Sequence, residues 1–250
     1  MSHHFDPNSL QFYMTIPSPC PYLPGRLERK LFTQLDPFSG PQLNDYLTHA
    51  GFRRSQNVIY RPACEACAEC RSLRVLARAF VPGRNLRRIR SRNTDLSAEV
   101  CEAYATREQF ELLSRYLHSR HAGGGMTDMD YARYKLMVED CAASTEIVEY
   151  RDPDSTLIAC MIVDRLGDGL SLVYSFFDPA AARRSLGHHM IIDQIQRTCS
   201  DGLRYTYLGY WVEGSPKMDY KARYQPCEVL SHKGWARIDP NIKTQAILKP

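Results

Sequence analysis

The spacing of apolar residues changes along the chain from a helical period to the short runs typical of strands. Apolar positions three or four residues apart predict helices at residues 42–50, 97–121, 128–141 and 183–199. Apolar runs bounded by turn residues predict strands at residues 57–61, 73–81, 146–150, 157–165, 170–178, 205–211 and 228–238. Residues 28–35 fit either a short helix or a strand. The interleaved elements predict a mixed fold of the α/β (α+β) class.

The chain divides most simply into two units, residues 1–94 and residues 95–250. The first unit opens with an irregular, proline-rich segment over residues 1–26 and contains a cluster of cysteines. The second holds most of the predicted helices and strands, and three glycines at 123–125 form a flexible link between two of its helices. We therefore expect a small cysteine-bearing N-terminal domain followed by a larger α/β domain.

Composition places the chain among ordinary globular proteins. Hydrophobic residues make up 44% and charged residues 24% of its 250 residues, which excludes collagen, coiled coil and disorder throughout. The longest apolar runs, such as residues 157–163, are far shorter than the roughly 20 residues that span a bilayer. The first residues also lack the basic and then apolar order of a secretory signal. We therefore expect a cytoplasmic protein that does not cross a membrane.

Positive charge is concentrated in one stretch of the sequence. The net charge is +4, and eight arginines lie between Arg71 and Arg92, with no acidic residue until Asp95. Guanidinium groups pair bidentately with phosphates, so this stretch is a candidate contact for a polyanion. The alternative is a solvated face whose charge is balanced by acids elsewhere.

Three cysteines share a short motif that is typical of metal ligands. Because the nine cysteines are odd in number and no export signal precedes them, a disulfide framework is not expected. The spacing Cys64-x2-Cys67-x2-Cys70 brings three thiols onto one loop, and zinc or an iron–sulfur cluster takes four ligands. Cys20 is the best candidate for the fourth ligand, and Cys227 is a weaker one. The alternative is a set of reduced thiols without a metal.

A predicted strand, loop and helix at residues 170–199 form a candidate anion site. The helix N-terminus lies at the edge of the sheet, where its amides and dipole favour an anion or a polarised carbonyl. GCN5-related acyltransferases place the pyrophosphate of their acyl carrier at such a loop. Arg184-x-x-Gly187 matches the first half of their pattern, but His189 stands where a second small residue is expected. This departure argues against coenzyme A as the carrier.

Cations and tyrosines alternate in the stretch SPKMDYKARYQP, residues 215–226. Lys217 and Lys221 are four residues apart, as are Tyr220 and Tyr224, so one helical turn would place each pair on its own face. Such a surface suits a carboxylate or phosphate held beside a flat group. The alternative is an amphipathic turn with packed tyrosines and solvated lysines.

Several strings together resemble one enzyme family. YSFFDP with RSLG, and GYWVEGSPKMDYKARYQP after them, are similar to the C-terminal half of the aminoacyl-tRNA–protein transferases, which include eukaryotic arginyltransferase. CPYLPGRLERKLF and YRPACEACAECRSLRV are similar to the bacterial branch, the aspartate/glutamate leucyltransferases. The resemblance extends from about residue 9 to residue 235. Eukaryotic relatives carry Cys-x2-Cys near the N-terminus, whereas this chain has Leu23 at the second position after Cys20.

The resemblance implies transfer of leucine from leucyl-tRNA to a protein that begins with Asp or Glu, which marks that protein for proteolysis. It also implies a GCN5-related N-acyltransferase-like core. The donor is already an activated ester, so no cofactor is required for the transfer itself. The choice of leucine rests on the likeness alone, and arginyl-tRNA is an alternative donor. A coenzyme A-dependent N-acetyltransferase and a non-catalytic RNA-binding module are alternatives from other classes.

The same resemblance suggests roles for individual residues. The expected cations for the acceptor's acidic side chain are Lys217, Lys221 and Arg223. The tyrosines expected to line the amino-acyl pocket or stack on the terminal adenine are Tyr174, Tyr220 and Tyr224. The expected general bases are Asp178, Glu213 and Asp219, of which Asp178 alternatively caps the following turn; Tyr174, Lys217 and Tyr220 are further catalytic candidates. Residues expected to bind elsewhere are Arg184 and Gly187 for the substrate, and Arg84, Arg87, Arg88, Arg90 and Arg92 for tRNA.

Overall fold

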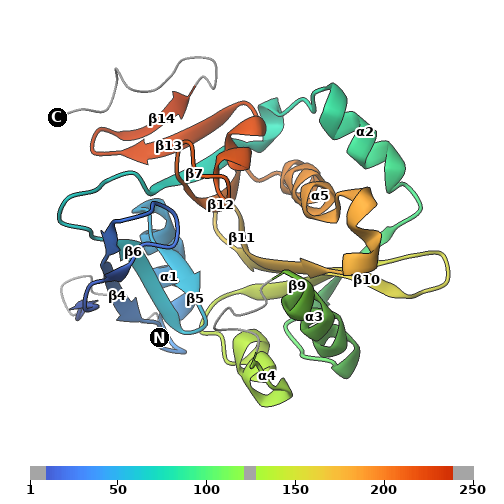
Figure 1. Cartoon of the computed structure of the whole chain (residues 1–250), viewed down its shortest axis with the longest axis horizontal. Coiled ribbons are helices and arrows are strands. Elements are labelled where there is room, and N and C mark those ends of the chain that lie inside the picture. Colours follow the sequence, from blue (N-terminus) through green and yellow to red (C-terminus); the bar gives the residue numbers. More distant parts are fainter. Residues whose placement is uncertain (1–9, 121–127, 239–250) are drawn as a thin grey trace.

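The computed structural model describes residues 10–120 and 128–238, and a small and a large sheet organise them (Figure 1). The small sheet has the order β1-β4-β6-β5 and consists of β1 (Tyr13–Met14), β4 (Lys30–Gln34), β6 (Val58–Pro62) and β5 (Arg53–Ser55). Helix α1 (Gly40–His49) buries Leu43 and Leu47 against it. A two-stranded ladder joins β2 (Ser18–Pro19) to β3 (Leu27–Glu28).

The large sheet has eight strands in the order β14-β13-β7-β12-β11-β10-β9-β8. All neighbours are antiparallel except β11 and β12, which are parallel. The strands are β7 (Arg71–Leu76), β8 (Ser97–Glu102), β9 (Thr145–Arg151), β10 (Leu157–Arg165), β11 (Gly169–Phe177), β12 (Tyr205–Trp211), β13 (Cys227–Ser231) and β14 (Gly234–Ile238). The connection from β11 to β12 is a crossover through the short helix η3 (Pro179–Arg184) and helix α5 (Leu186–Ser200).

Helices cover both faces of the large sheet, and the sequence of strand β10 is apolar on both faces as a result. Its alternate residues Ala159, Met161 and Val163 belong to the core beneath α2 (Arg84–Arg92) and α5. Cys160 and Ile162 between them face the core beneath α3 (Arg107–Arg120) and α4 (Tyr131–Glu139). Successive strand residues point to opposite faces, so a strand buried on both sides is a continuous apolar run. No helix within the described residues is long and apolar enough to cross a membrane.

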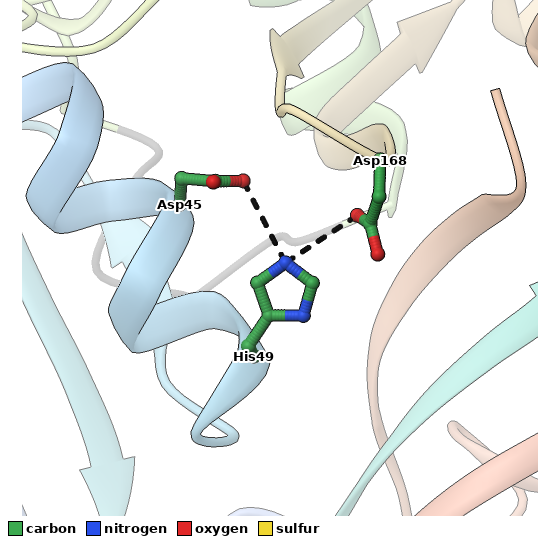
Figure 2. A group of neighbouring side chains, drawn as sticks. All are labelled: Asp45, His49 and Asp168. Atoms are coloured by element: carbon green, nitrogen blue, oxygen red, sulfur yellow. Dashed lines mark ion pairs between the residues drawn. The ribbon is translucent and has the colours of Figure 1, made fainter.

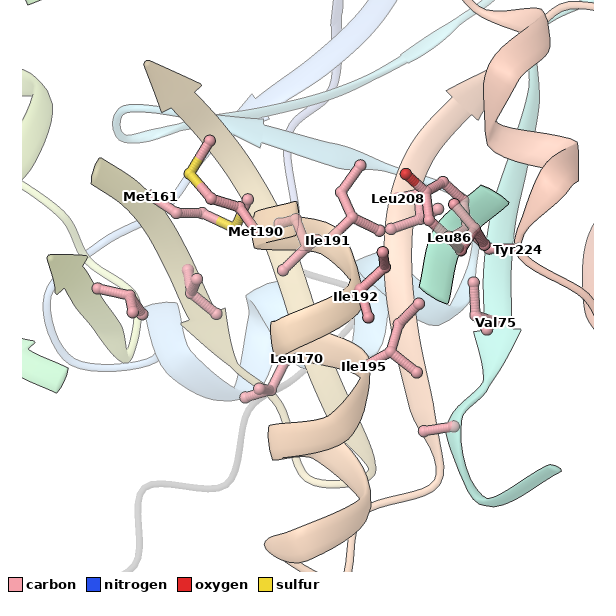
Figure 3. Close-up of a cluster of buried hydrophobic side chains, with 14 of the residues drawn as sticks. Val75, Leu86, Met161, Leu170, Met190, Ile191, Ile192, Ile195, Leu208 and Tyr224 are labelled. Atoms are coloured by element: carbon pink, nitrogen blue, oxygen red, sulfur yellow. The ribbon is translucent and has the colours of Figure 1, made fainter. Parts of the chain in front are cut away.

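Helix α5 holds the central strands together (Figure 3). Its side chains Met190, Ile191, Ile192 and Ile195 are all buried in the core shared with strands β10, β11 and β12. Burying side chains of this size stabilises a fold by about 1.5–3 kcal/mol each. The packing fixes the first turn of α5 beside the ends of β11 and β12, where the predicted strand–loop–helix site lies.

The small sheet is joined to the large one through a buried ion pair. Arg54 of β5 donates to both carboxylate oxygens of Asp164 on β10, each over 2.6 Å. Asn44 and Thr145 also donate to this carboxylate. Burial opposes the charge of Arg54, but the carboxylate of Asp164 outweighs it and raises the pKa of the guanidinium. A buried charge pair that is this fully hydrogen-bonded fixes the position of the small sheet.

The structure confirms the mixed α/β class and most of the predicted elements. Strands β10 and β12 have the predicted bounds, and helix α1 ends one residue before Ala50, with Gly51 at a φ of +87°. Residues 28–35 contain strand residues rather than a helix. His121, at the end of a predicted helix, and the glycines 123–125 lie outside the described residues.

Three predicted elements differ from the structure. The helix predicted at 97–121 is strand β8 followed by α3, because Thr106 and Gln109 cap the helix reciprocally over 3.0 and 3.1 Å. The strand predicted at 228–238 is the hairpin of β13 and β14, with Gly234 at a φ of +98°. Residues 73–81 are a strand only as far as Leu76.

Helix α2 was not predicted, because Leu86 is its only buried residue and its pattern is almost wholly polar. It packs on α5, and β7 lies between β12 and β13 of the large sheet. Part of the unit predicted at residues 1–94 therefore builds the large sheet and its helical layer. The division into two domains stays a prediction.

Candidate active site

Strands β11 and β12 pair in parallel at their first residues, and further along the side chain of Arg53 lies between them. The Nη2 atom of Arg53 donates to the carbonyl oxygens of Leu172 and Val173 on β11, over 3.0 and 2.6 Å. On β12, Gly209 has a φ of +72°, and a Cβ atom there would lie 1.5 Å from Nη1 of Arg53. The absence of a side chain at Gly209 therefore makes room for the guanidinium between the two strands.

An imidazole held by two tyrosines lies where α5 meets the polar stretch after β12. The Nδ1 atom of His188 lies 2.6 Å from the hydroxyl of Tyr224. The ring of Tyr220, in the short helix η4 (Asp219–Arg223), stands edge-on to His188 with centroids 5.6 Å apart. Tyr224 itself is completely buried. The structure thus brings two of the predicted tyrosines together around His188.

The electrostatic surroundings keep this group uncharged at neutral pH. Burial, and then the positive charge of Arg223, lower the pKa of His188 from its ordinary 6.5. Burial raises the pKa of Tyr220, and the positive charge of Arg53 opposes that rise. Arg53 therefore acts on the same site as His188. A neutral, half-buried imidazole is a group that can accept a proton.

Tyr174 on β11 is part of the same aromatic region. Burial, and then the nearby Tyr116, raise the pKa of Tyr174 to about 12. Tyr116 of α3 also contributes to the raised pKa of Tyr220, and its ring packs edge-on against Phe177 at 5.0 Å. Tyrosines from α3, β11 and η4 therefore lie close together. The roles expected of Tyr174 and Tyr220 toward a substrate stay predictions.

Lys221 lies inside the protein and not on its surface. Its Nζ atom donates a hydrogen bond of 2.6 Å to the backbone carbonyl oxygen of Tyr210, and the residue is only 6% exposed. Burial, and then the charge of Arg53, lower the pKa of this amine well below its ordinary range. The expectation that Lys221 presents a cation to an acceptor is therefore corrected: its amine holds η4 against β12.

The other two predicted cations are on the surface. Lys217 and Arg223 are exposed, and Arg223 is close enough to His188 to affect its pKa. Asp219, a predicted base, is exposed and accepts a hydrogen bond of 3.3 Å from the backbone N–H of Gly214. Lys217 and Arg223 thus flank η4 where charged ligands can reach them.

The remaining predicted bases have partners elsewhere. Asp178 accepts a hydrogen bond of 2.9 Å from the N–H of Ala180 and caps η3, which is the alternative role considered for it. Glu213 pairs with Arg71 over 3.4 Å. Each carboxylate therefore has a structural contact, whereas His188 has a low pKa and lies among the tyrosines.

Arg184 and Gly187 lie at the start of α5 but differ in their surroundings. Arg184 donates to Asn93 over 2.9 Å and forms an ion pair with Asp95. Its charge therefore ties η3 to the end of α2, in contrast to the expected contact with a substrate. Gly187 faces Phe177, since a Cβ atom there would lie 3.5 Å from that ring.

The arginines predicted to contact tRNA lie on α2. All five are exposed, while Leu86 anchors the helix; they are Arg84, Arg87, Arg88, Arg90 and Arg92. The active-site loop is the segment 178–185 between β11 and α5. The C-terminal end of α2 touches this loop, because Asn93 donates to the carbonyl of Arg184 over 3.0 Å. The basic surface thus reaches the loop that precedes His188.

The four predicted metal ligands line one cavity of about 740 Å³. They are Cys20, Cys64, Cys67 and Cys70, all partly exposed free thiols. Burial raises the pKa of Cys70 to about 12, with further contributions from Cys20, Cys67 and Cys64 in that order. Cys227 is completely buried and does not line this cavity.

Sequence reasoning did not identify Arg53 or His188 as site residues. Arg53 belongs to the small sheet and is about 120 residues away from the carbonyls it binds. His188 had a weaker signal: it directly follows the Arg184-x-x-Gly187 pattern, within the helix predicted at residues 183–199. Its contact with Tyr224 spans 36 positions, so the sequence alone does not reveal the pair.

Two family models match the chain. The one described as "Arginine-tRNA-protein transferase, N terminus" matches residues 18–88, and "Arginine-tRNA-protein transferase, C terminus" matches residues 108–231. These two matches, which together cover most of the chain, define an aminoacyltransferase.

Relatives with similar sequences identify one group within this class of enzymes. Aspartate/glutamate leucyltransferases of Maricaulis maris and Caulobacter vibrioides are 54% and 52% identical, each over 94% of this chain and over 92% and 86% of their own lengths. That of Bradyrhizobium sp. (strain BTAi1) is 53% identical over 92% of both chains. The chain therefore belongs to the aspartate/glutamate leucyltransferases of the arginine-tRNA-protein transferase family.

Solved structures with a similar arrangement are more distant in sequence. FemX is 8% identical with a TM-score of 0.48, over 84% of this chain and 82% of its own. L-PGS from Bacillus licheniformis is 14% identical with a TM-score of 0.48, over 69% of this chain and 60% of its own.

Proposed function

We propose that the protein transfers leucine from leucyl-tRNA to the N-terminal residue of proteins that begin with Asp or Glu. The observation that carries this proposal is the identity of 52–54% with aspartate/glutamate leucyltransferases along 94% of the chain. The product begins with leucine, and its role as a signal for proteolysis is part of the proposal. So is a cytoplasmic location, where charged tRNA and nascent acceptors meet.

In this reaction the α-amine of the acceptor attacks the carbonyl carbon of the leucyl ester. A peptide bond forms, the bond to the tRNA ribose oxygen breaks, and one proton moves from the amine to the departing oxygen. The amine has an ordinary pKa of about 7.7–8.0, so a useful fraction is neutral near pH 7. Orienting the two substrates therefore supplies much of the rate, and a mild base suffices.

His188 is our candidate for this base, in place of Asp178, Glu213 or Asp219. Its imidazole is uncharged at neutral pH because burial and Arg223 lower its pKa. The 2.6 Å contact with Tyr224 fixes the ring. In the tautomer proposed here Nδ1–H donates to the Tyr224 hydroxyl, so Nε2 carries the lone pair that accepts the proton of the amine. His188 then passes that proton to the ribose oxygen as the tRNA leaves.

The surrounding residues suit the two substrates. Tyr174 and Tyr220 supply aromatic surface for the leucyl side chain or the terminal adenine. Lys217 and Arg223 are the exposed cations available to the acidic side chain of the acceptor. The arginines of α2 would hold the tRNA backbone, because all five are exposed and the helix ends beside the active-site loop.

The cysteine cavity is a candidate structural zinc or iron–sulfur site. Four thiols from two distant parts of the chain line it, and burial, and then the neighbouring thiols, raise the pKa of Cys70. A bound cation would favour the thiolates that this cluster otherwise disfavours. Such a metal would join the N-terminal segment to the loop before β7, and the transfer reaction needs nothing from it.

The test is transfer of radiolabelled amino acid from charged tRNA to model proteins that begin with Asp, Glu, Lys or Ala. Leucyl-tRNA and arginyl-tRNA are compared side by side, with labelled acetyl-coenzyme A as a third donor. We expect leucine on the Asp and Glu acceptors only. Arginine in its place would overturn the donor, and acetyl transfer without tRNA would overturn the class.

A further inference from the structure

A second group of metal-ligating side chains lies outside the cysteine cavity, between α1 and the turn that joins β10 to β11. Asp45 and His49 are one turn apart on α1, and Asp168 comes from the turn (Figure 2). The Nε2 atom of His49 lies 3.7 Å from Oδ1 of Asp45 and 3.5 Å from Oδ1 of Asp168. One donor atom from each residue lies within 4.8 Å of the other two.

Neighbouring groups hold these three side chains in place. The N–H of Gly167 donates to Oδ1 of Asp45 over 3.0 Å, and the hydroxyl of Tyr207 donates to Asp168 over 3.2 Å. The same hydroxyl lies 3.3 Å from Nδ1 of His49.

These contacts determine what His49 presents to the carboxylates. The hydroxyl proton of Tyr207 is used on Asp168, so its oxygen is left to accept hydrogen bonds from Nδ1–H of His49 and from Nη1 of Arg74, each over 3.3 Å. The Nε2 atom then carries the lone pair, and Figure 2 shows it directed between the two carboxylates. Two anionic oxygens and a lone pair that face one point repel one another unless a cation lies between them.

The distances distinguish a metal ion from a shared proton. Both separations from Nε2, 3.5 and 3.7 Å, exceed the roughly 2.7–3.2 Å of an N–H···O hydrogen bond. Zinc bonds to nitrogen and oxygen are about 2.0–2.2 Å long, so a tetrahedral site separates neighbouring ligand atoms by about 3.3–3.6 Å. The separation of 3.5 Å lies within this range, that of 3.7 Å is slightly longer, and all three donor atoms lie within 4.8 Å of one another. Small side-chain shifts would therefore bring the three groups to zinc-ligand spacing with a fourth position open.

We propose that Asp45, His49 and Asp168 bind one Zn²⁺ ion, with water at the fourth position. Tyr207 would orient two of the three ligands, as second-shell groups of zinc sites commonly do. The ion would connect α1 of the small sheet to the large sheet, on a path separate from the Arg54–Asp164 pair. This proposal rests on geometry alone and is independent of the transfer reaction.

The test uses the full-length protein freed of metal by a chelator, at pH 8, where an ordinary imidazole is uncharged. Zinc stoichiometry is measured after dialysis for the wild type, His49→Ala, Asp168→Asn and, as a control, His118→Ala, an exposed histidine of α3. Cobalt is then added as a spectroscopic probe. Circular dichroism verifies that each variant is folded.

We expect His49→Ala and Asp168→Asn each to lose one equivalent of zinc that His118→Ala retains. Tyr207→Phe should weaken binding about 10- to 100-fold. Cobalt at this site should show ligand-field bands that persist when the cysteines are alkylated, because no thiolate is involved. Zinc should also raise the melting temperature of the wild type but not of His49→Ala. Unchanged stoichiometry in the folded variants, or bands that vanish on alkylation, would overturn the proposal.

Discussion

The amine of Lys221 is hydrogen-bonded to the backbone carbonyl of Tyr210 over 2.6 Å, in a site from which solvent is excluded. Helix η4 is short, and this contact fixes it to the end of β12. Tyr220 lies one position before Lys221, so the same hydrogen bond sets where the Tyr220 ring meets His188. Lys221 of the SPKMDYKARYQP string therefore positions Tyr220 from inside the protein.

Replacing Lys221 should destabilise the protein as a whole. Lys221→Ala removes a buried stem and leaves the carbonyl of Tyr210 without its donor, which together cost about 2–4 kcal/mol in the free energy of unfolding. Urea denaturation measures the loss. Lys217→Ala is the matched control, because Lys217 is exposed on the same segment, and it should change stability by less than about 0.5 kcal/mol. Equal stability of the two variants would contradict the buried role.

Gly209 and Gly214 allow the position of Arg53 to be tested. Their φ values are +72° and +71°, so alanine at either suffers the same backbone strain of about 1–2 kcal/mol. A Cβ atom at Gly209 also collides with Arg53, whereas nothing lies within 4 Å of one at Gly214. Gly209→Ala should therefore lower the free energy of unfolding more than Gly214→Ala does.

A double variant separates the collision from the strain. In the Arg53→Ala background the guanidinium is gone, so Gly209→Ala should cost no more than Gly214→Ala does. The difference between the two backgrounds is the coupling energy of the pair. A cost that stays the same without Arg53 would show that the side chain does not lie between β11 and β12.

The parts of the fold that the sequence predicts are those in which one local signal decides the structure. Strand β10 is buried on both faces, so its apolar run extends from its first residue to Val163, close to the end of the strand at Arg165. Strand β8 is exposed along most of its length, and the helical spacing of the apolar residues that follow it extended the predicted helix too far. The Thr106–Gln109 cap was the signal that separates the two elements.

The active site was predictable only in part for a similar reason. Tyr220 and Tyr224 belong to one string, and the structure places both beside His188. Arg53 reaches the site from the small sheet. A local sequence pattern does not indicate a contact between residues of two separate sheets. Exposure of a lysine is likewise set by packing, so the charge of Lys221 alone predicted the wrong environment.

The exposed arginines of α2 should determine the salt dependence of tRNA binding. Each phosphate contact releases about one counterion, so Arg87→Gln and Arg88→Gln should each lower the slope of log K against log salt by about 1. Filter binding between 50 and 200 mM salt, values typical of such titrations, measures the slope. Arg165→Gln is the control, since Arg165 already pairs with Asp201 over 2.8 Å. A slope that is unaltered in both α2 variants would remove this helix from the interface.

The lowered pKa of His188 makes a prediction about stability as well as rate. The folded protein binds the proton of His188 less readily than the unfolded chain does, because burial and Arg223 disfavour the charged ring. Stability from this group is therefore fully present above about pH 6.5, the unfolded value, and is lost as the pH falls through the folded value. His188→Gln should flatten the fall in the free energy of unfolding between pH 7.5 and 5, a range chosen around that value.

The same variant tests the base. His188→Gln should lower kcat for leucyl transfer about 10²- to 10⁴-fold, the usual contribution of a general base, while affinity for tRNA is kept. On the acid side of the pH profile, kcat/KM should fall with an apparent pKa near the ordinary value of the α-amine, about 7.7–8.0. As the pH is lowered, the α-amine is protonated before His188 is, so the supply of neutral amine limits the reaction first. Tyr224→Phe, which removes only the hydroxyl at Nδ1, should lower kcat less. If His188→Gln kept a normal kcat but lost the pH-dependent stability, His188 would have only a structural role, and one of the carboxylates would be the base.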